Sequence, residues 1–65
     1  MLFESREQKT ERIYQELKQG KKVSRWQVMP VRFDLLKKAK SEGNKDILEE
    51  LKFLIEEAKA SLWII

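Results

Sequence analysis

The chain contains no cysteine and no histidine, and it has one proline and two glycines among 65 residues. A disulfide is therefore impossible, and a Cys/His metal site is excluded, which leaves carboxylates as the only candidate metal ligands. We expect neither a metal nor a cofactor. The absence of cysteine is typical of proteins from a reducing compartment.

Long apolar runs are also absent. The first residues already include Glu4 and Arg6, so the apolar core of a signal peptide, about 7 to 15 residues, is missing. No apolar stretch approaches the roughly 20 residues that span a bilayer. The sequence predicts a cytoplasmic protein that does not bind membranes.

The usual catalytic groups are missing as well. There is no histidine for proton transfer at neutral pH, no cysteine nucleophile and no glycine-rich phosphate loop. The pairs Glu49-Glu50 and Glu56-Glu57 do not act as paired carboxylates, because neighbours on a helix point about 100° apart. We expect no catalytic residues, no small-molecule substrate and no enzymatic activity.

Most of the chain consists of residues that favour helices. It predicts one all-α domain, residues 1–65, built as a small three- to four-helix bundle with a helix-turn-helix-like middle and a long C-terminal amphipathic helix. The expected helices span about residues 5–19, 25–29, 31–41 and 45–63.

Capping signals mark the ends of these helices. Serine followed three residues later by glutamine is a capping-box pattern, and it begins at Ser5 and again at Ser24. Gly20 is placed to end the first helix in the left-handed conformation, and Gly43 ends the third helix. Pro30 suits the first turn of the third helix. The cap of the last helix is either Asn44 or Asp46.

Apolar spacing predicts the buried faces. The first helix offers Ile13, Tyr14 and Leu17. The third offers Val28, Val31 or Arg32, Leu35, Leu36 and Ala39. The last carries a heptad seam, widened on one side by Ile47 and Leu54, and made of Leu48, Leu51, Ile55, Ala58, Leu62 and Ile65.

Some apolar residues of the last helix do not fit this seam, and a chain of this length is only marginally stable by itself. Either these residues wrap into one intramolecular core or the chain self-associates. We predict a homodimer with two-fold pairing or, failing that, a partner protein, joined through residues 53–65. The candidate interface residues are Phe53, Leu62, Trp63, Ile64 and Ile65.

Charge is unevenly distributed along the chain. Residues 18–40 carry eight Lys or Arg against the single acid Asp34, a net charge of +7, whereas residues 1–17 carry −1 and residues 41–65 carry −3. A strongly basic segment attracts a polyanion such as nucleic acid, an acidic protein surface or an anionic membrane. The alternative is that these cations only solvate the surface.

The stretch RIYQELKQGKKVSRWQ, Arg12 to Gln27, has Ile13 and Leu17 four apart, then Gly-Lys, then a serine capping a helix that carries Trp26. It resembles small winged-helix and helix-turn-helix proteins of phages and mobile elements. No wing follows, because EGNKDILEELK continues directly into helix. The resemblance implies a regulator or accessory factor that binds double-stranded DNA.

In that interpretation the basic residues have different roles. Lys21, Lys22 and Arg25 would neutralise phosphates around the start of the second helix, and Lys18 belongs to the same basic segment. Arg32 and either Lys37 or Lys38 would reach base edges. Trp26 would either stack on an unpaired base or, as is more usual for tryptophan on a short amphipathic helix, anchor the core.

A protein-interaction module is the alternative function. Small, highly charged helical chains with spare apolar surface often act by docking on a larger protein, as phage-encoded inhibitors and adaptors do. The apolar residues of the last helix would then contact a host protein.

Overall fold

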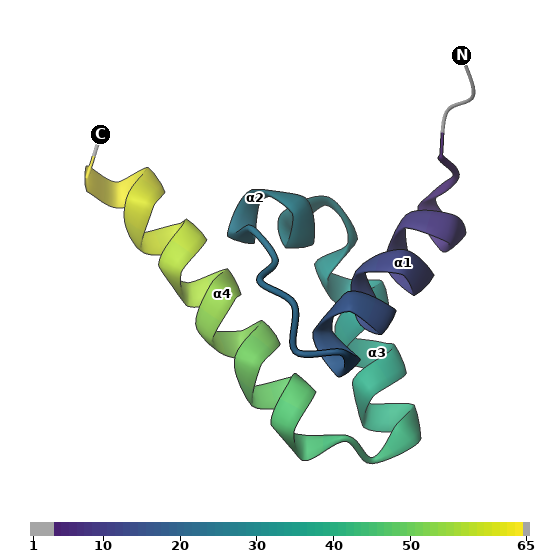
Figure 1. Cartoon of the computed structure of the whole chain (residues 1–65). Coiled ribbons are helices and arrows are strands. Elements are labelled where there is room, and N and C mark those ends of the chain that lie inside the picture. The colour runs from purple at the N-terminus through teal and green to yellow at the C-terminus, as the bar shows by residue number, and fades with distance from the viewer. Residues whose placement is uncertain (1–3, 65) are drawn as a thin grey trace.

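The computed structural model describes residues 4–64, and for Trp63 and Ile64 it describes the backbone alone. Its elements are α1 (Arg6–Lys18), α2 (Arg25–Val28), the 3-10 turn η1 (Met29–Val31), α3 (Arg32–Glu42) and α4 (Lys45–Ile64), as Figure 1 shows. No strand occurs among the described residues. The predicted all-α fold, a small helical bundle, is confirmed.

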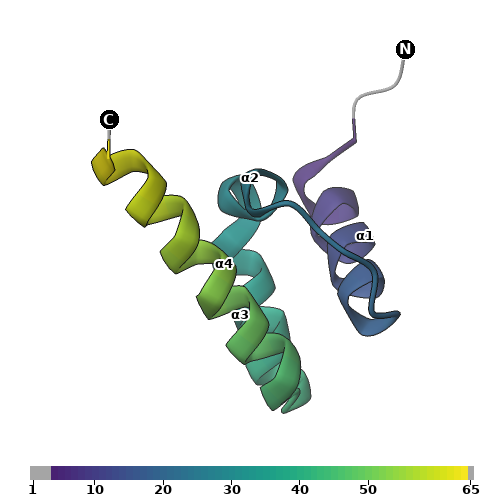
Figure 2. The same ribbon diagram turned by 60° about the vertical axis from the view of Figure 1, so that its left-hand side comes forward.

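The helices α3 and α4 form a hairpin joined at Gly43 and Asn44, with α1 beside α3 and the short α2 between α1 and the middle of α4 (Figures 1 and 2). The 20 residues of α4 make it much longer than α3, which has 11. In both views the last turns of α4 therefore run past α2 and lack a neighbour on the bundle side.

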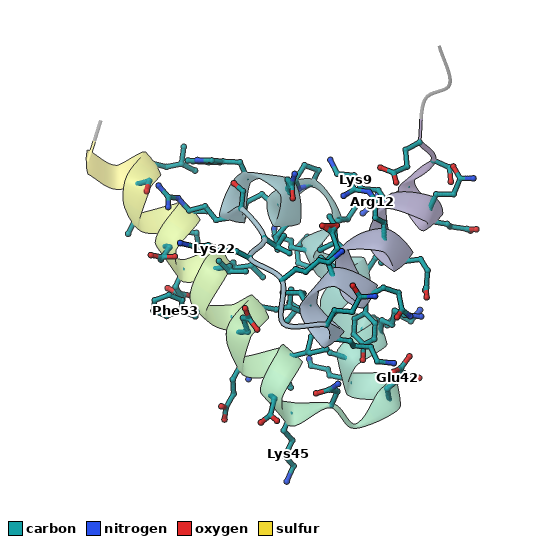
Figure 3. All side chains as sticks on the ribbon, viewed as in Figure 1. Lys9, Arg12, Lys22, Glu42, Lys45 and Phe53 are labelled. Atoms are coloured by element: carbon teal, nitrogen blue, oxygen red, sulfur yellow. The ribbon has the colours of Figure 1, made fainter. Side chains whose placement is uncertain are left out.

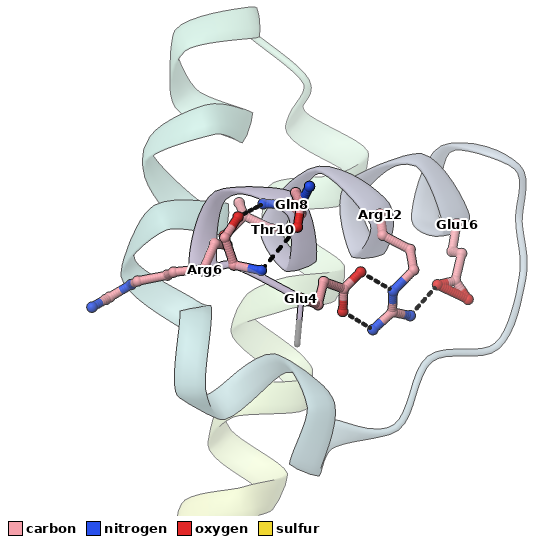
Figure 4. A network of polar contacts seen from close by, with 7 residues as sticks. Glu4, Arg6, Gln8, Thr10, Arg12 and Glu16 are labelled. Carbon is pink, nitrogen blue, oxygen red and sulfur yellow. Dashed lines mark hydrogen bonds and ion pairs between the residues drawn. The ribbon is translucent and has the colours of Figure 1, made fainter. Parts of the chain in front are cut away.

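The start of α1 follows its sequence signal. Ser5 Oγ accepts a hydrogen bond from the Gln8 amide at 3.1 Å, and the Ser5 amide donates to Gln8 Oε1 at 3.0 Å (Figure 4). This reciprocal pair is the predicted capping box, and it satisfies two donors that the first turn of a helix leaves free.

Glycine ends α1 and α3, as predicted. Gly20 has φ 76° and Gly43 has φ 66°, values of the left-handed region that favours glycine. Beyond Gly20 the Lys21 amide donates to the Glu16 carbonyl at 2.9 Å, and beyond Gly43 the Asn44 amide donates to the Ala39 carbonyl at 3.0 Å. Both helix ends are thus closed by the same Schellman-type bond.

The remaining caps refine the prediction. Ser24 Oγ accepts a hydrogen bond from the Trp26 amide at 3.2 Å. The second bond of a capping box, from the Ser24 amide to Gln27 Oε1, is absent from the described hydrogen bonds. Asn44, not Asp46, caps α4, because its Oδ1 accepts from the Ile47 amide at 3.2 Å. Pro30 lies in η1, directly before α3.

One apolar core connects all the helices. The predicted residues of α1 are buried, and so are Val28, Val31, Leu35 and Ala39 of the predicted third-helix face, whereas Leu36 is only half-buried against the core. Val23 of the α1–α2 loop is buried as well, and the helical spacing does not reveal it. The core cluster consists of Ile13, Tyr14, Leu17, Val23, Val28, Val31, Leu35, Ala39, Ile47, Leu51 and Ile55.

The buried face of α4 differs from the predicted seam. Ile47 is buried while Leu48 is only half-buried, so the helix is turned toward Ile47. Leu62 is 57% exposed because it lies on the turns of α4 that run past the rest of the bundle. The predicted seam is therefore wrong at Leu62 and correct at Leu51, Ile55 and Ala58, and Leu48 packs against the core while staying partly exposed. Ile65 lies outside the described residues.

Candidate nucleic-acid interface

The segment from Arg25 to Lys40, which forms α2, η1 and most of α3, presents a surface of one charge sign. Its only acidic residue is Asp34. Arg6 of α1 donates a hydrogen bond to Asp34 Oδ2 at 2.6 Å and compensates that charge. The charge left on this surface is therefore positive.

Two aromatic side chains are exposed on the same segment. Trp26 is 51% exposed and Phe33 is 64% exposed. The Arg25 guanidinium carbon lies 5.4 Å from the centroid of the Trp26 ring, and that of Arg32 lies 4.6 Å from the centroid of the Phe33 ring. Each ring thus carries a cation within the distance of a cation–π interaction.

The exposure of Trp26 shows that the core-anchor interpretation is wrong. The helix α2 has only four residues, and Val28 fills its core position with no exposed surface. Trp26 lies two residues before Val28, which is about 200° around the helix. Once Val28 points inward, Trp26 must point to solvent.

The two arginines are engaged to different extents. Arg32 Nη1 donates to the carbonyl of Met29 at 2.6 Å, so Arg32 also stabilises the turn that leads into α3. Arg25 is half-buried, and its Nε has no hydrogen-bond partner among the described residues. The guanidinium of Arg25 is therefore the less engaged of the two.

The exposed side of α3 is basic as well, and its Lys37 and Ser41 also line the groove between α1 and α3. Phe33, Lys37, Lys40 and Ser41 are all exposed. Spacings of four and seven residues from Phe33 place Lys37 and Lys40 on the same face of the helix. That face lies away from the buried Leu35. The sequence prediction omitted Phe33 and Lys40, although this spacing was available to find them.

Lys38 lies on the other side of α3, against α1. Its Nζ is 2.8 Å from Glu11 Oε2 and 3.7 Å from Glu42 Oε2, and it lies 5.3 Å from the centroid of the Tyr14 ring. The hydrogen bond to Glu11 raises the pKa of Lys38. Of the two lysines that the sequence left open for base contacts, Lys37 is the one that remains free of ion pairs in the described structure.

Lys18 lies outside the α2–α3 surface. It is 5.7 Å from the Tyr14 ring centroid, and it lines a shallow hollow with Asn44 and Asp46 at the start of α4. Lys18 therefore shares this hollow with a carboxylate, that of Asp46.

Lys21 and Lys22 are exposed in the loop before α2, and Lys22 extends toward the middle of α4 (Figure 3). The start of α2 is not an anion site, because the helix is one turn long and Ser24 already accepts from the Trp26 amide. Five of the predicted nucleic-acid residues lie on the α2–α3 segment: Arg25, Trp26, Arg32, Lys37 and Lys38. Of these, Lys38 is paired with Glu11 of α1.

The predicted partner interface is only partly described. Phe53 is 64% exposed and lies on the side of α4 that faces away from α1 (Figure 3), and Leu62 is exposed as well. The side chains of Trp63 and Ile64, and Ile65 as a whole, lie outside the described residues. Within those residues no helix is both long and apolar enough to cross a membrane.

Comparisons with protein-family models, with curated proteins and with solved structures found no match for this chain.

Proposed function

We propose that the chain is a small nucleic-acid-binding protein of helix-turn-helix type that acts by binding and not by catalysis. One observation carries the proposal: the surface of α2 and α3 combines exposed aromatic rings with unpaired cations, and its single carboxylate is held by Arg6. Nucleic acids offer the matching chemistry, namely phosphates for the cations and flat bases or apolar base edges for the rings.

Duplex DNA is the ligand we propose, with the outer face of α3 in the major groove. Lys37 and Lys40 would contact phosphates, and Arg25 would contact a phosphate or a guanine edge. Phe33 is placed on the same helix face, where an apolar side chain contacts the methyl group of thymine. Arg32 would act mainly by holding the turn before α3, because it already donates to Met29.

Docking on a larger protein is the second candidate. It is favoured by Phe53 and Leu62, which leave apolar surface of α4 exposed. The acidic outer side of α4 would also repel a polyanion. The α2–α3 surface and the outer side of α4 are therefore suited to different ligands.

Fluorescence anisotropy with a labelled random-sequence duplex tests the proposal. Affinity should fall with salt, with a slope of about −0.9 for each phosphate neutralised. Arg25→Gln and Lys37→Gln should each reduce that slope by about one. Lys45→Gln is the matched control, because it removes the same charge. Lys45 lies at the start of α4 and points away from the bundle (Figure 3).

Tryptophan fluorescence gives an independent measurement. In a Trp63→Phe background Trp26 is the only tryptophan, and its emission should change on binding because it lies on the proposed surface. Equal slopes for Lys37→Gln and Lys45→Gln, or stronger binding to a single strand than to the duplex, would contradict the duplex assignment.

A further inference from the structure

The outer side of α4 is a charged face with an apolar centre. Residues three and four apart lie side by side on a helix, so Phe53 is flanked by Glu49 and Glu50 on one side and by Glu56 and Glu57 on the other. Phe53 is two residues from the fully buried Leu51 and therefore points away from the core. We call Phe53 with these four glutamates the α4 face.

The carboxylates of the α4 face have no ionic partner within the described part of the chain. The three lysines of α4 repeat every seven residues and so lie along one edge of the helix, beside the face and not within it. None of the described ion pairs includes them. The charge of this face is thus available to something outside the molecule.

The chain itself carries a complementary surface. The α2–α3 segment presents exposed Trp26 and Phe33 among Arg25, Lys37 and Lys40, none of which forms an ion pair with another described residue. The α4 face thus has one aromatic ring among carboxylates, and the α2–α3 surface has two aromatic rings among cations, so the two charge signs are opposite. Within one molecule no described ion pair joins them.

We infer that the α4 face binds the α2–α3 surface of a second copy of this chain. Such pairing is head to tail, because two different surfaces meet, and each added copy leaves one surface of each kind free. It differs from the two-fold homodimer that the sequence predicts through residues 53–65. It also covers the surface proposed to bind DNA. A copy whose α2–α3 surface is occupied by a neighbour therefore cannot bind DNA through it, and this consequence rests on the proposed function.

Sedimentation equilibrium at about 0.05 M and about 0.5 M salt tests the pairing. At low salt the weight-average mass should rise with concentration without stopping at the dimer, and high salt should return it to the monomer. A monomer at every concentration, or association that high salt does not weaken, would overturn the inference.

Two variants identify the surfaces. Phe53→Ser with Glu56→Lys breaks the α4 face, and Arg25→Glu with Lys37→Glu breaks the α2–α3 surface. Each variant alone should lose self-association. Their equimolar mixture should form a heterodimer that cannot grow, because each variant keeps the surface that the other lacks.

The mixture excludes the other geometries. A two-fold dimer through α4 would persist in the second variant alone, and mixing would not restore association to the first variant. That result would overturn the inference. Each variant keeps one intact surface, so failure of either variant to bind the wild type would also overturn it. Circular dichroism confirms that each variant is folded, and NMR spectra of one labelled variant should show shifts at its intact surface when the other is added.

Unlabelled duplex DNA separates this inference from the proposed function. If both are correct, an excess of duplex should dissociate the assembly. If self-association follows the variants as stated but duplex neither binds nor competes, the pairing stands and the proposed function fails. If the chain binds duplex but remains a monomer at every concentration, the proposed function stands and the pairing fails.

Discussion

The α1–α3 side of the bundle and the outer side of α4 have similar numbers of carboxylates but use them differently. On the first side five of six carboxylates lie in described ion pairs, including the contacts of Arg12 with Glu4 and Glu16 in Figure 4. On α4 none of five does so among the described residues. The first set joins segments of the chain, and the second remains available to a partner.

The difference follows from how the helices meet. The groove between α1 and α3, about 820 Å3, is lined by charges of both signs, and Arg6 and Lys38 reach across it to acids on the facing helix. The outer side of α4 faces no other helix. Its carboxylates therefore form no ion pair within residues 4–62, and the two regions should respond differently to mutation.

The largest effect is expected from the buried side of α4. Leu51→Ala removes a fully buried side chain and should lower the free energy of unfolding by about 2 to 5 kcal/mol. Phe53→Ala, two residues away on the exposed side, should change it by no more than about 0.5 kcal/mol. Urea denaturation of both variants under high salt measures the contrast. A large loss from Phe53→Ala would mean that this ring stabilises the monomer.

A smaller effect is expected where α1 meets the end of α3. The buried Tyr14 donates its hydroxyl hydrogen to Glu42 Oε1 at 3.0 Å, and burial together with this bond raises the pKa of Tyr14. Tyr14→Phe should therefore cost about 1 kcal/mol of unfolding free energy. Glu42→Gln, which keeps an acceptor, should cost less. Equal stability of Tyr14→Phe and the wild type would show that the bond is not needed.

The smallest effect concerns acid. A hydrogen bond from Lys38 lowers the pKa of Glu11 below its ordinary value of 4.5, and one from Arg12 likewise lowers the pKa of Glu4. A lowered folded-state pKa gives stability that is present above pH 4.5 and is lost as the pH falls through the folded-state value. The temperature at the midpoint of thermal unfolding should therefore decrease as the pH is lowered below 4.5.

Matched variants assign this acid sensitivity to one side of the bundle. Glu11→Gln should make the unfolding midpoint less dependent on pH in the acid range, because it removes a group whose pKa differs between the folded and unfolded states. Glu56→Gln on the α4 face is the control, since Glu56 has no described ion pair. Identical acid profiles for the two variants would refute the assignment to the α1–α3 side.

Local signals in the sequence determined where helices begin and end. Ser5 with Gln8 fixes the start of α1, and Gly20 and Gly43 end α1 and α3, because these effects depend only on residues within a few positions of one another. The basic character of residues 18–40 is likewise a property of composition. Helical spacing also gave the buried face of α1, because each helix must bury its apolar side.

Only the tertiary structure decided which residues share a surface. The sequence could not place Lys38 against Glu11, since the two are far apart along the chain and meet only because α1 packs beside α3. It could not give the rotation of α4 toward Ile47, or the exposure of Leu62, because both depend on which helices lie beside α4 and where they end. Trp26 is exposed for the same reason: Val28 occupies the one inward position of a single-turn helix, and that choice is made by packing.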